Sequence, residues 1–144
     1  MKTEEKPTVL YWDASAVLSA LLKDDHSQEA HRWAIRPGYH FLSTLAHAEV
    51  LAVLRRIGRE RLLAEVLVKA AEESLETGPW RSWQGVPRQN DVRQLSARYS
   101  LRGADLWHLA AAKILQEDLP ELNLLTFDRR LIVAAQGEGM IQAL

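Results

Sequence analysis

The fold is decided by the stretch VLYWDASAVL, residues 9–18. Its first four residues are aliphatic or aromatic, and a short run of this kind is typical of a strand buried on both faces of a parallel sheet. The run stops at Asp13, after which small and aliphatic residues continue toward Leu22 with helical spacing. We therefore expect Asp13 at the carboxyl end of a central strand, which is where open α/β sheets bind their ligands.

Length and composition indicate one globular domain. The chain has 144 residues, of which 47% are hydrophobic and 26% charged, as in ordinary soluble proteins. We expect a single domain over residues 1–144, with residues 1–7 as a flexible polar tail. No apolar run approaches the roughly 20 residues of a membrane-spanning helix, and the polar start lacks a signal-peptide core. A cytoplasmic protein without a membrane partner is therefore expected.

Cysteine usage and charge exclude several classes of site. The sequence contains no cysteine, which excludes disulfides and thiolate zinc sites. A metal ion would be bound through oxygen or imidazole, which favours hard divalent cations. The net charge of -1 argues against a general nucleic-acid coating protein, because such proteins are normally basic.

Local arginine clusters are compatible with an enzyme that binds a polyanion beside an acidic centre. Candidate clusters contain Arg55, Arg56, Arg59 and Arg61, then Arg98 and Arg102, then Arg129 and Arg130. Solvated helix faces are the alternative explanation for each cluster.

Strands and helices alternate along the rest of the chain. We expect strands at residues 9–12, 39–42, 80–83, 122–126 and 140–143. Helices are expected at residues 14–23, from Asp25 or Ser27 to 35, from Ser43 or Thr44 to 56, 59–76, 89–99, 104–116 and 129–136. In the helix over residues 59–76, one apolar face contains Leu62, Leu63, Val66, Leu67 and Ala70. This alternation predicts a three-layer α/β/α sandwich around a central, mostly parallel sheet of four to five strands.

Three aspartates stand at the starts of predicted helices. Asp13 and Asp128 each follow a predicted strand, and Asp105 lies in the first turn of its helix. Helix N-caps, or helix-dipole stabilisation of about 0.3–1 kcal/mol, are the alternative explanations. His108 shares a helix face with Asp105, and we expect a packed or supporting histidine rather than a metal ligand.

Glu49 lies within a largely apolar helix. Its neighbours one turn away are Leu45, Ala46, Ala52 and Val53. None of these is a cation, so the glutamate must reach solvent, find a partner elsewhere in the fold, or bind an ion.

Four segments resemble the motifs of PIN-domain ribonucleases, most closely those of the VapC-type toxins of toxin–antitoxin pairs. In chain order they are Trp12-Asp13-Ala14-Ser15, Ala48-Glu49-Val50 followed by Arg55-Arg56, RGADLWHLA at residues 102–110, and LTFDRRL at residues 125–131. The resemblance covers most of the chain from Val9 to Gly139, with four acidic positions in register. Tyr11, Trp12 and Trp107 are bulkier than is usual in the family, and residues 78–90 match none of its segments, which leaves the choice of substrate open.

The resemblance implies a metal-dependent endoribonuclease that uses an activated water. It implies that the catalytic residues and the ligands of Mg²⁺ or Mn²⁺ are Asp13, Glu49, Asp105 and Asp128. The chemistry of the residues agrees, because clustered carboxylates repel one another unless a cation compensates their charge. Ser15 and Thr126 are expected to support the site, and candidates for RNA binding are Arg55, Arg56 and Arg102.

The resemblance also implies a cognate antitoxin protein and a homodimer. The main alternative is an interaction module that keeps the fold but does not cut, and whose acidic pocket receives a structural ion or an arginine from a partner. A haloacid-dehalogenase-like phosphatase is a further alternative. Such enzymes require a second aspartate two residues after the first, where this chain has Ser15.

Overall fold

The computed structural model describes residues 6–140, so residues 1–5 and 141–144 lie outside its described part. Most of the expected N-terminal tail falls outside this range, as do the last three residues of the strand expected at 140–143. Met140 is described, and its carbonyl accepts a hydrogen bond from Leu124 N at 2.7 Å.

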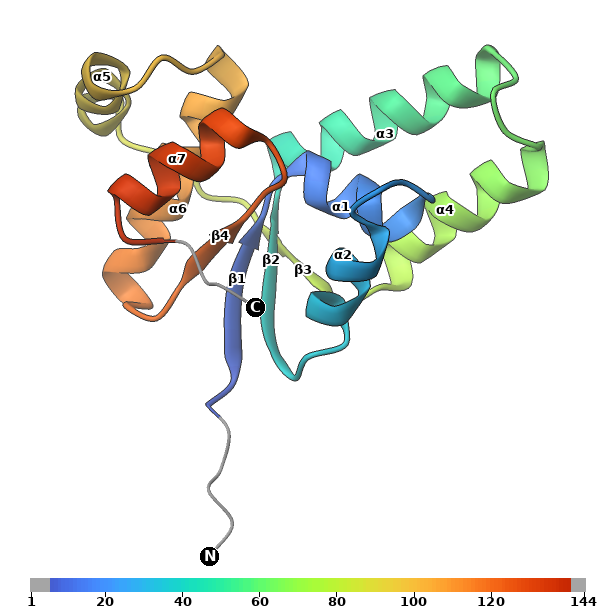
Figure 1. Cartoon of the computed structure of the whole chain (residues 1–144), viewed down its shortest axis with the longest axis horizontal. Helices are drawn as coiled ribbons and strands as arrows, with labels where there is room; N and C mark the ends of the chain where they lie inside the picture. Colours follow the sequence, from blue (N-terminus) through green and yellow to red (C-terminus); the bar gives the residue numbers. More distant parts are fainter. Residues whose placement is uncertain (1–5, 141–144) are drawn as a thin grey trace, which may run out of the picture.

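Strands and helices follow one another largely as the sequence predicts (Figure 1). In chain order they are β1 (Thr8–Trp12), α1 (Ala14–Leu21), α2 (Ser27–Ala34), β2 (Gly38–Ser43), α3 (Thr44–Arg59), α4 (Glu65–Thr77), β3 (Trp80–Trp83), α5 (Gln89–Arg98), α6 (Gly103–Asp118), β4 (Asn123–Leu125) and α7 (Arg129–Gly137). Apart from the helix expected over 59–76 and the strand expected at 140–143, the predicted bounds lie within one helical turn of the observed ones. Among the described residues, no helix combines the length and apolar character that crossing a bilayer requires.

Within residues 6–140 the sheet has four strands in the order β3-β2-β1-β4, and every pairing is parallel. β1 is central, pairing with β2 up to Trp12 opposite Leu42 and with β4 up to Trp12 opposite Leu125. Because all strands point the same way, the residues that follow β1, β2 and β4 meet at one edge of the sheet. The segment 80–83 forms a strand, β3, as expected, and it lies at one edge of the sheet.

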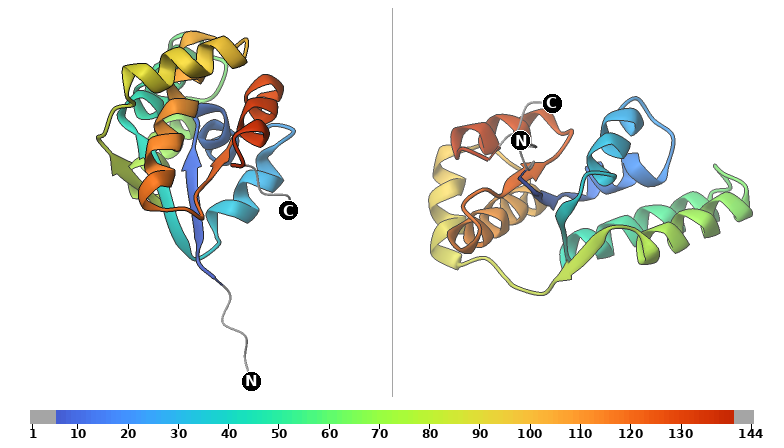
Figure 2. Two further views of the ribbon diagram at one scale, coloured as in Figure 1. Left: turned by 90° about the vertical axis from the view of Figure 1, so that its left-hand side faces the viewer. Right: turned by 90° about the horizontal axis from the view of Figure 1, so that it is seen from below.

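Helices cover both faces of the sheet. Val9 and Tyr11 point into a core formed with α5, α6 and α7, whereas Leu10 and Trp12 point into a core formed with α1, α2, α3 and α4. This alternation follows from the two-residue repeat of a strand. Figures 1 and 2 show the two helical layers on opposite sides of the sheet, with α3 and α4 projecting beyond it as a hairpin. The expected three-layer α/β/α sandwich is confirmed.

The helix expected over residues 59–76 is wrong in its start. α3 continues to Arg59, the chain turns at Arg61 with φ at 55°, and α4 begins at Glu65. The buried face of α4 consists of Val68, Ala71 and Leu75. The apolar face identified from the sequence is a different one and is exposed, and it consists of Leu62, Leu63, Val66, Leu67 and Ala70. The segment carries two apolar stripes, and contact with α1 and α3 determines which one is buried.

Candidate active site

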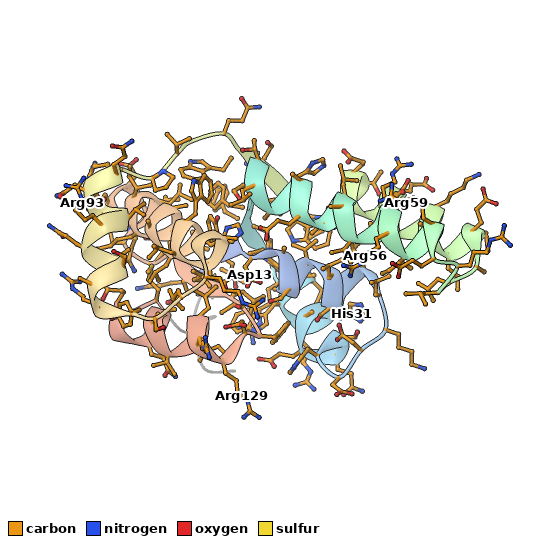
Figure 3. The ribbon with its side chains drawn as sticks, turned by 90° about the horizontal axis from the view of Figure 1, so that it is seen from above. Asp13, His31, Arg56, Arg59, Arg93 and Arg129 are labelled. Carbon is orange, nitrogen blue, oxygen red and sulfur yellow. The ribbon has the colours of Figure 1, made fainter. Side chains whose placement is uncertain are left out.

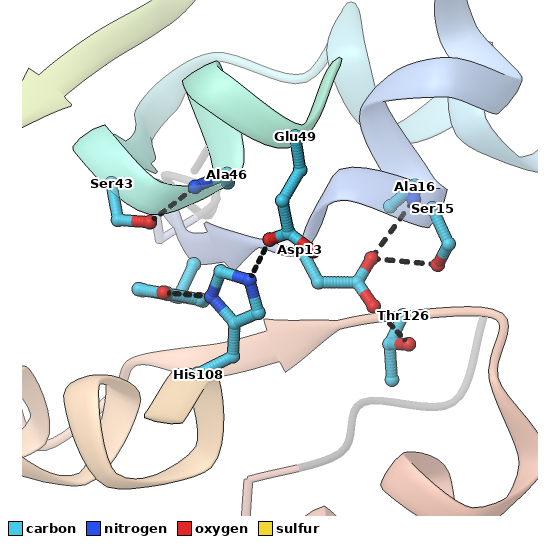
Figure 4. Close-up of polar contacts among 9 residues, drawn as sticks. Asp13, Ser15, Ala16, Ser43, Ala46, Glu49, His108 and Thr126 are labelled. Atoms are coloured by element: carbon cyan, nitrogen blue, oxygen red, sulfur yellow. Dashed lines mark hydrogen bonds and ion pairs between the residues drawn. The ribbon is translucent and has the colours of Figure 1, made fainter. Parts of the chain in front are cut away.

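Asp13 occupies the junction between β1 and α1, and its carboxylate accepts three hydrogen bonds (Figure 4). Oδ1 accepts from the backbone N–H of Ala16 at 2.9 Å and from the hydroxyl of Ser15 at 2.7 Å. Oδ2 accepts from the hydroxyl of Thr126 at 2.5 Å. Asp13 is therefore the N-cap of α1, and the same three donors hold its carboxylate at the carboxyl edge of the sheet.

The Asp13 carboxylate is buried, with only 3% of the residue exposed. Burial raises its pKa above the ordinary value, although the hydrogen bonds from Thr126, Ala16 and Ser15 and the electrostatic interaction with His108 act in the opposite direction. A buried carboxylate of this kind destabilises the fold unless a cation lies nearby, so the position favours cation binding.

Asp128 occupies the corresponding junction between β4 and α7. It caps α7 by accepting a hydrogen bond from Leu131 N at 3.0 Å. Its own backbone N–H donates to the Thr126 hydroxyl at 3.1 Å, and the N–H of Phe127 donates to the Ser15 hydroxyl at 3.3 Å. The two hydroxyls that hold the carboxylate at the end of β1 therefore also fix the loop that carries Asp128.

Asp105 lies in the first turn of α6 and is half-buried. Burial is the largest cause that raises its pKa, and the negative charges of Asp128 and Glu49 raise it further. His108 and Arg102 act in the opposite direction. This mutual influence places three of the predicted carboxylates in one electrostatic environment on the sheet edge.

Glu49 reaches the site from α3 and is held by a histidine. His108 Nε2 lies 2.6 Å from Glu49 Oε1, and His108 Nδ1 lies 2.5 Å from the Tyr11 hydroxyl. His108 and Tyr11 are 1% and 0% exposed. The sequence predicts a packed or supporting histidine at 108, but it indicates Tyr11 only as a bulky residue of the central strand. The signal that could have identified Tyr11 is general, because a buried phenol requires a hydrogen-bond partner.

An open cleft of about 430 Å³ begins beside these carboxylates. Its lining residues are Leu101, Arg102, Asp105, Phe127, Asp128, Arg129 and Arg130. Arg102 had been identified from the sequence as an RNA-binding candidate. Arg129 and Arg130 had been noticed only as a charge cluster, and their position after the cap of α7 brings them to the same cleft.

The two candidate arginines on α3 lie elsewhere. Arg55 pairs with Glu72 of α4 at 3.2 Å and lines a separate groove between α3 and α4. Arg56 is exposed on α3, and Figure 3 shows it on the same side of the molecule as Asp13. No Lys or Arg in residues 6–140 forms a salt bridge with any of the four carboxylates.

The chemistry of the donor set fits a hard divalent cation, because every candidate ligand is a carboxylate oxygen. In the described part of the chain, no three histidine or acidic side chains are arranged as a group that could hold a metal ion. The site is open in the sense that the described residues hold no preassembled set of three protein ligands. Mg²⁺ does not require such a set, because it is usually bound through one or two carboxylates, several waters and the phosphates of a substrate.

Comparison with known proteins connects this site to a family. The family described as PIN domain matches residues 10–136. Two curated relatives, Ribonuclease VapC45 and Ribonuclease VapC49 from two strains of Mycobacterium tuberculosis, are each 32% identical over 135 residues. The aligned region spans 91% of this chain and 92% of each relative.

Solved structures share the fold. Mycobacterium tuberculosis VapC20, described as a sarcin-ricin loop cleaving toxin, superposes with a TM-score of 0.60 at 18% identity, covering 93% of this chain and 98% of VapC20. The Pyrobaculum aerophilum protein PAE2754 superposes with a TM-score of 0.60 at 16% identity, covering 90% of this chain and 87% of that protein. The family match and the identity to the curated relatives, found on a chain whose motifs converge at one sheet edge, show that this chain belongs to the PIN-domain family.

Proposed function

We propose that the protein is a metal-dependent endoribonuclease that hydrolyses phosphodiester bonds of RNA in the cytoplasm. The ribonuclease names of its relatives support this proposal. The observation that carries it is the buried Asp13 carboxylate at the sheet edge, next to an electrostatically linked group of Glu49, Asp105 and Asp128, none of which forms a salt bridge with a lysine or arginine among the described residues.

Mg²⁺ or Mn²⁺ is the cofactor of this proposal. Asp13, Asp105 and Asp128 would hold it directly or through water, and Glu49 would complete the set. When bound, such an ion polarises the phosphate, lowers the pKa of water and stabilises charge on the leaving oxygen. Ser15 and Thr126 support the site, because their hydroxyls fix the orientation of Asp13.

Glu49 is the proposed group that orients the attacking water and accepts its proton. Only its Oε1 has a hydrogen-bond partner within residues 6–140, which leaves Oε2 for this task. The water oxygen bonds to phosphorus, the bond from phosphorus to the 3′ oxygen breaks, and the products carry 5′-phosphate and 3′-hydroxyl ends. Arg102 at the cleft, together with Arg55 and Arg56 on α3, are the proposed RNA-binding residues.

A cognate antitoxin and a homodimer complete the proposal. The α3–α4 hairpin exposes apolar side chains that a protein partner would remove from water, namely Leu62, Leu63, Val66 and Leu67. Sedimentation of the purified protein determines whether it forms a homodimer. If a dimer forms through this surface, Leu67→Asp dissociates it, whereas a dimer that survives the substitution uses another face.

The decisive experiment is cleavage of defined RNAs in the presence of Mg²⁺ or Mn²⁺. Wild type is compared with wild type plus chelator and with Asp13→Asn, which retains an N-capping side chain. We expect loss of cleavage in both, and 5′-phosphate ends in the wild-type products. Cleavage that persists in Asp13→Asn, or a cyclic 2′,3′-phosphate product, contradicts the proposed mechanism.

The same experiment separates the enzyme from a non-cutting interaction module. The open arrangement of the carboxylates is the observation that favours this second candidate. A module of that kind binds its partner but shows no turnover with any RNA or either metal ion.

A further inference from the structure

We propose that His108 is a positioning residue that holds Glu49 in its working orientation, and that Tyr11 selects the tautomer in which His108 does so. This inference rests on the proposed function, because Glu49 belongs to that site. The inference assigns roles to His108 and Tyr11, two buried residues that do not take part in the proposed reaction itself.

Three separate elements meet in this chain of hydrogen bonds (Figure 4). Tyr11 comes from β1, His108 from α6 and Glu49 from α3, and the two hydrogen bonds of 2.5 Å and 2.6 Å join residues 97 and 59 positions apart. His108 lies wholly inside the protein, whereas the Glu49 side chain is 34% exposed. The buried imidazole therefore connects the core to a carboxylate that stands at the surface of the cleft.

The direction of both hydrogen bonds follows from the chemistry of the partners. A neutral imidazole has one nitrogen that donates and one that accepts, and an ionised carboxylate only accepts. Glu49 Oε1 therefore accepts from Nε2 of His108, which carries the hydrogen of the neutral ring. Nδ1 then has no hydrogen and accepts one from the Tyr11 hydroxyl.

The consequence for Glu49 is a fixed side chain. A partly exposed glutamate has several rotamers, and ordering such a side chain has an entropic cost. The hydrogen bond to Oε1 orders the side chain before RNA arrives and leaves Oε2 for the attacking water. Loss of this bond is expected to lower kcat more than it raises KM, because Glu49 acts on the water and not on the binding of RNA.

The fold supplies a matched control on the opposite face of the sheet. The indole N–H of Trp12 donates to His40 Nδ1 at 3.0 Å, and His40 Nε2 lies 2.9 Å from the carbonyl of Arg36. His40 is 2% exposed, so it has the same burial and the same pattern of partners as His108. Its Nε2 lies against a backbone carbonyl instead of a carboxylate of the site. Substituting His40 therefore measures the loss of a buried, hydrogen-bonded histidine that does not contact the site.

The first experiment measures kcat and KM for RNA cleavage in His108→Leu, His108→Gln and His40→Leu. We expect His108→Leu to lower kcat about 10–100-fold with little change in KM. His108→Gln should recover part of this loss, because its amide N–H can donate to Glu49. Equal kcat losses in His40→Leu and His108→Leu, at comparable thermal stability, overturn the proposal.

The second experiment places His108→Leu in a Glu49→Gln background. If His108 acts through Glu49, its substitution adds no further loss there, whereas independent effects would multiply. A multiplied loss contradicts the proposal.

The third experiment needs neither RNA nor metal. ¹⁵N chemical shifts of the His108 ring should show a protonated Nε2 and an unprotonated Nδ1 in wild type, and Tyr11→Phe should change this tautomer ratio. A wild-type ring protonated on Nδ1 overturns the assignment. If wild type cuts no RNA, the proposed function fails, and the ring shifts still decide whether the Tyr11–His108–Glu49 chain exists as described.

Discussion

The hydroxyl of Thr126 donates to Oδ2 of Asp13 at 2.5 Å, although 113 residues separate the two in the sequence. The same hydroxyl accepts the backbone N–H of Asp128 at 3.1 Å. One side chain therefore sets both the orientation of the buried carboxylate after β1 and the start of the loop after β4. This link makes Thr126 the point at which the two strand ends become one site.

Replacing Thr126 by valine removes this link while keeping the shape of the side chain. We expect RNA cleavage to fall at least about 10-fold, and the free energy of unfolding to fall by about 1–3 kcal/mol because buried polar groups lose their partner. Thr126→Ser keeps the hydroxyl and should retain most of the activity. Cleavage rates and denaturant unfolding measure both effects, and wild-type activity in Thr126→Val would show that the link is dispensable.

Asp105 makes the metal-free protein sensitive to pH. Burial and the charges of Asp128 and Glu49 raise its pKa, so above the ordinary aspartate range the folded state binds more protons than the unfolded state. The contribution of Asp105 to stability is therefore highest below that range and is lost as pH rises through the raised pKa. Asp105→Asn should remove this loss and raise the melting temperature of the metal-free protein at neutral pH by a few degrees.

Divalent cations should reverse the order of the melting temperatures of wild type and Asp105→Asn. Mg²⁺ binds the folded state and raises the melting temperature of wild type with increasing concentration, but it should have little effect on Asp105→Asn. Asp118→Asn, at the exposed end of the same helix, is the control and should behave as wild type. Equal Mg²⁺ stabilisation of wild type and Asp105→Asn would exclude Asp105 from the metal site.

Arg129 and Arg130 line the cleft, and their contribution to RNA binding should appear in its salt dependence. For single-stranded RNA, each phosphate contact that is lost should reduce the slope of log K against log salt by about 0.7. We expect Arg129→Ala combined with Arg130→Ala to flatten this slope, measured in the Asp13→Asn background. Arg88→Ala is the control, because Arg88 pairs with Glu117 away from the cleft. An unchanged slope in the double variant would place the RNA elsewhere, for example along Arg56.

Glu138 should control the acid stability of the fold, independently of the site. Burial raises its pKa, but hydrogen bonds from Lys113 and Tyr99 and the charges of Lys113 and Arg98 outweigh this effect, so the pKa lies below its ordinary value. The stability from these contacts is present above the ordinary glutamate pKa and is lost as pH falls through the lowered one. Glu138→Gln should cost about 2 kcal/mol at neutral pH and flatten the loss in acid, as urea unfolding between pH 3 and about 7 can measure.

The matched control for this acid stability is Glu117→Gln. Glu117 pairs with Arg88 at 2.5 Å, but both side chains are exposed, and exposed pairs contribute little to stability. Equal losses from the two substitutions would mean that burial of Glu138 does not strengthen its contacts.

Local patterns were sufficient for the architecture and for the placement of Asp13 and Asp128, whereas the sequence left open what Glu49 contacts. The apolar run that ends at Asp13 predicts a central strand, since only a strand covered on both faces consists entirely of apolar residues. Asp13 and Asp128 each follow a strand, and a parallel sheet brings such positions to one edge whatever the intervening loops do. The alternation of strands and helices then predicts the layers.

Only the tertiary structure decided which elements contact one another, because a local sequence pattern does not distinguish between competing contacts. In α4 two apolar stripes compete, and packing against α1 and α3 buries Val68, Ala71 and Leu75 and leaves Leu67 exposed. Likewise, a tyrosine in a strand and a histidine in a helix each fit the pattern of buried positions, whether or not their side chains are in contact. Their hydrogen bond depends on the distance between β1 and α6, which is set by the packing of the whole domain and by no short stretch of sequence.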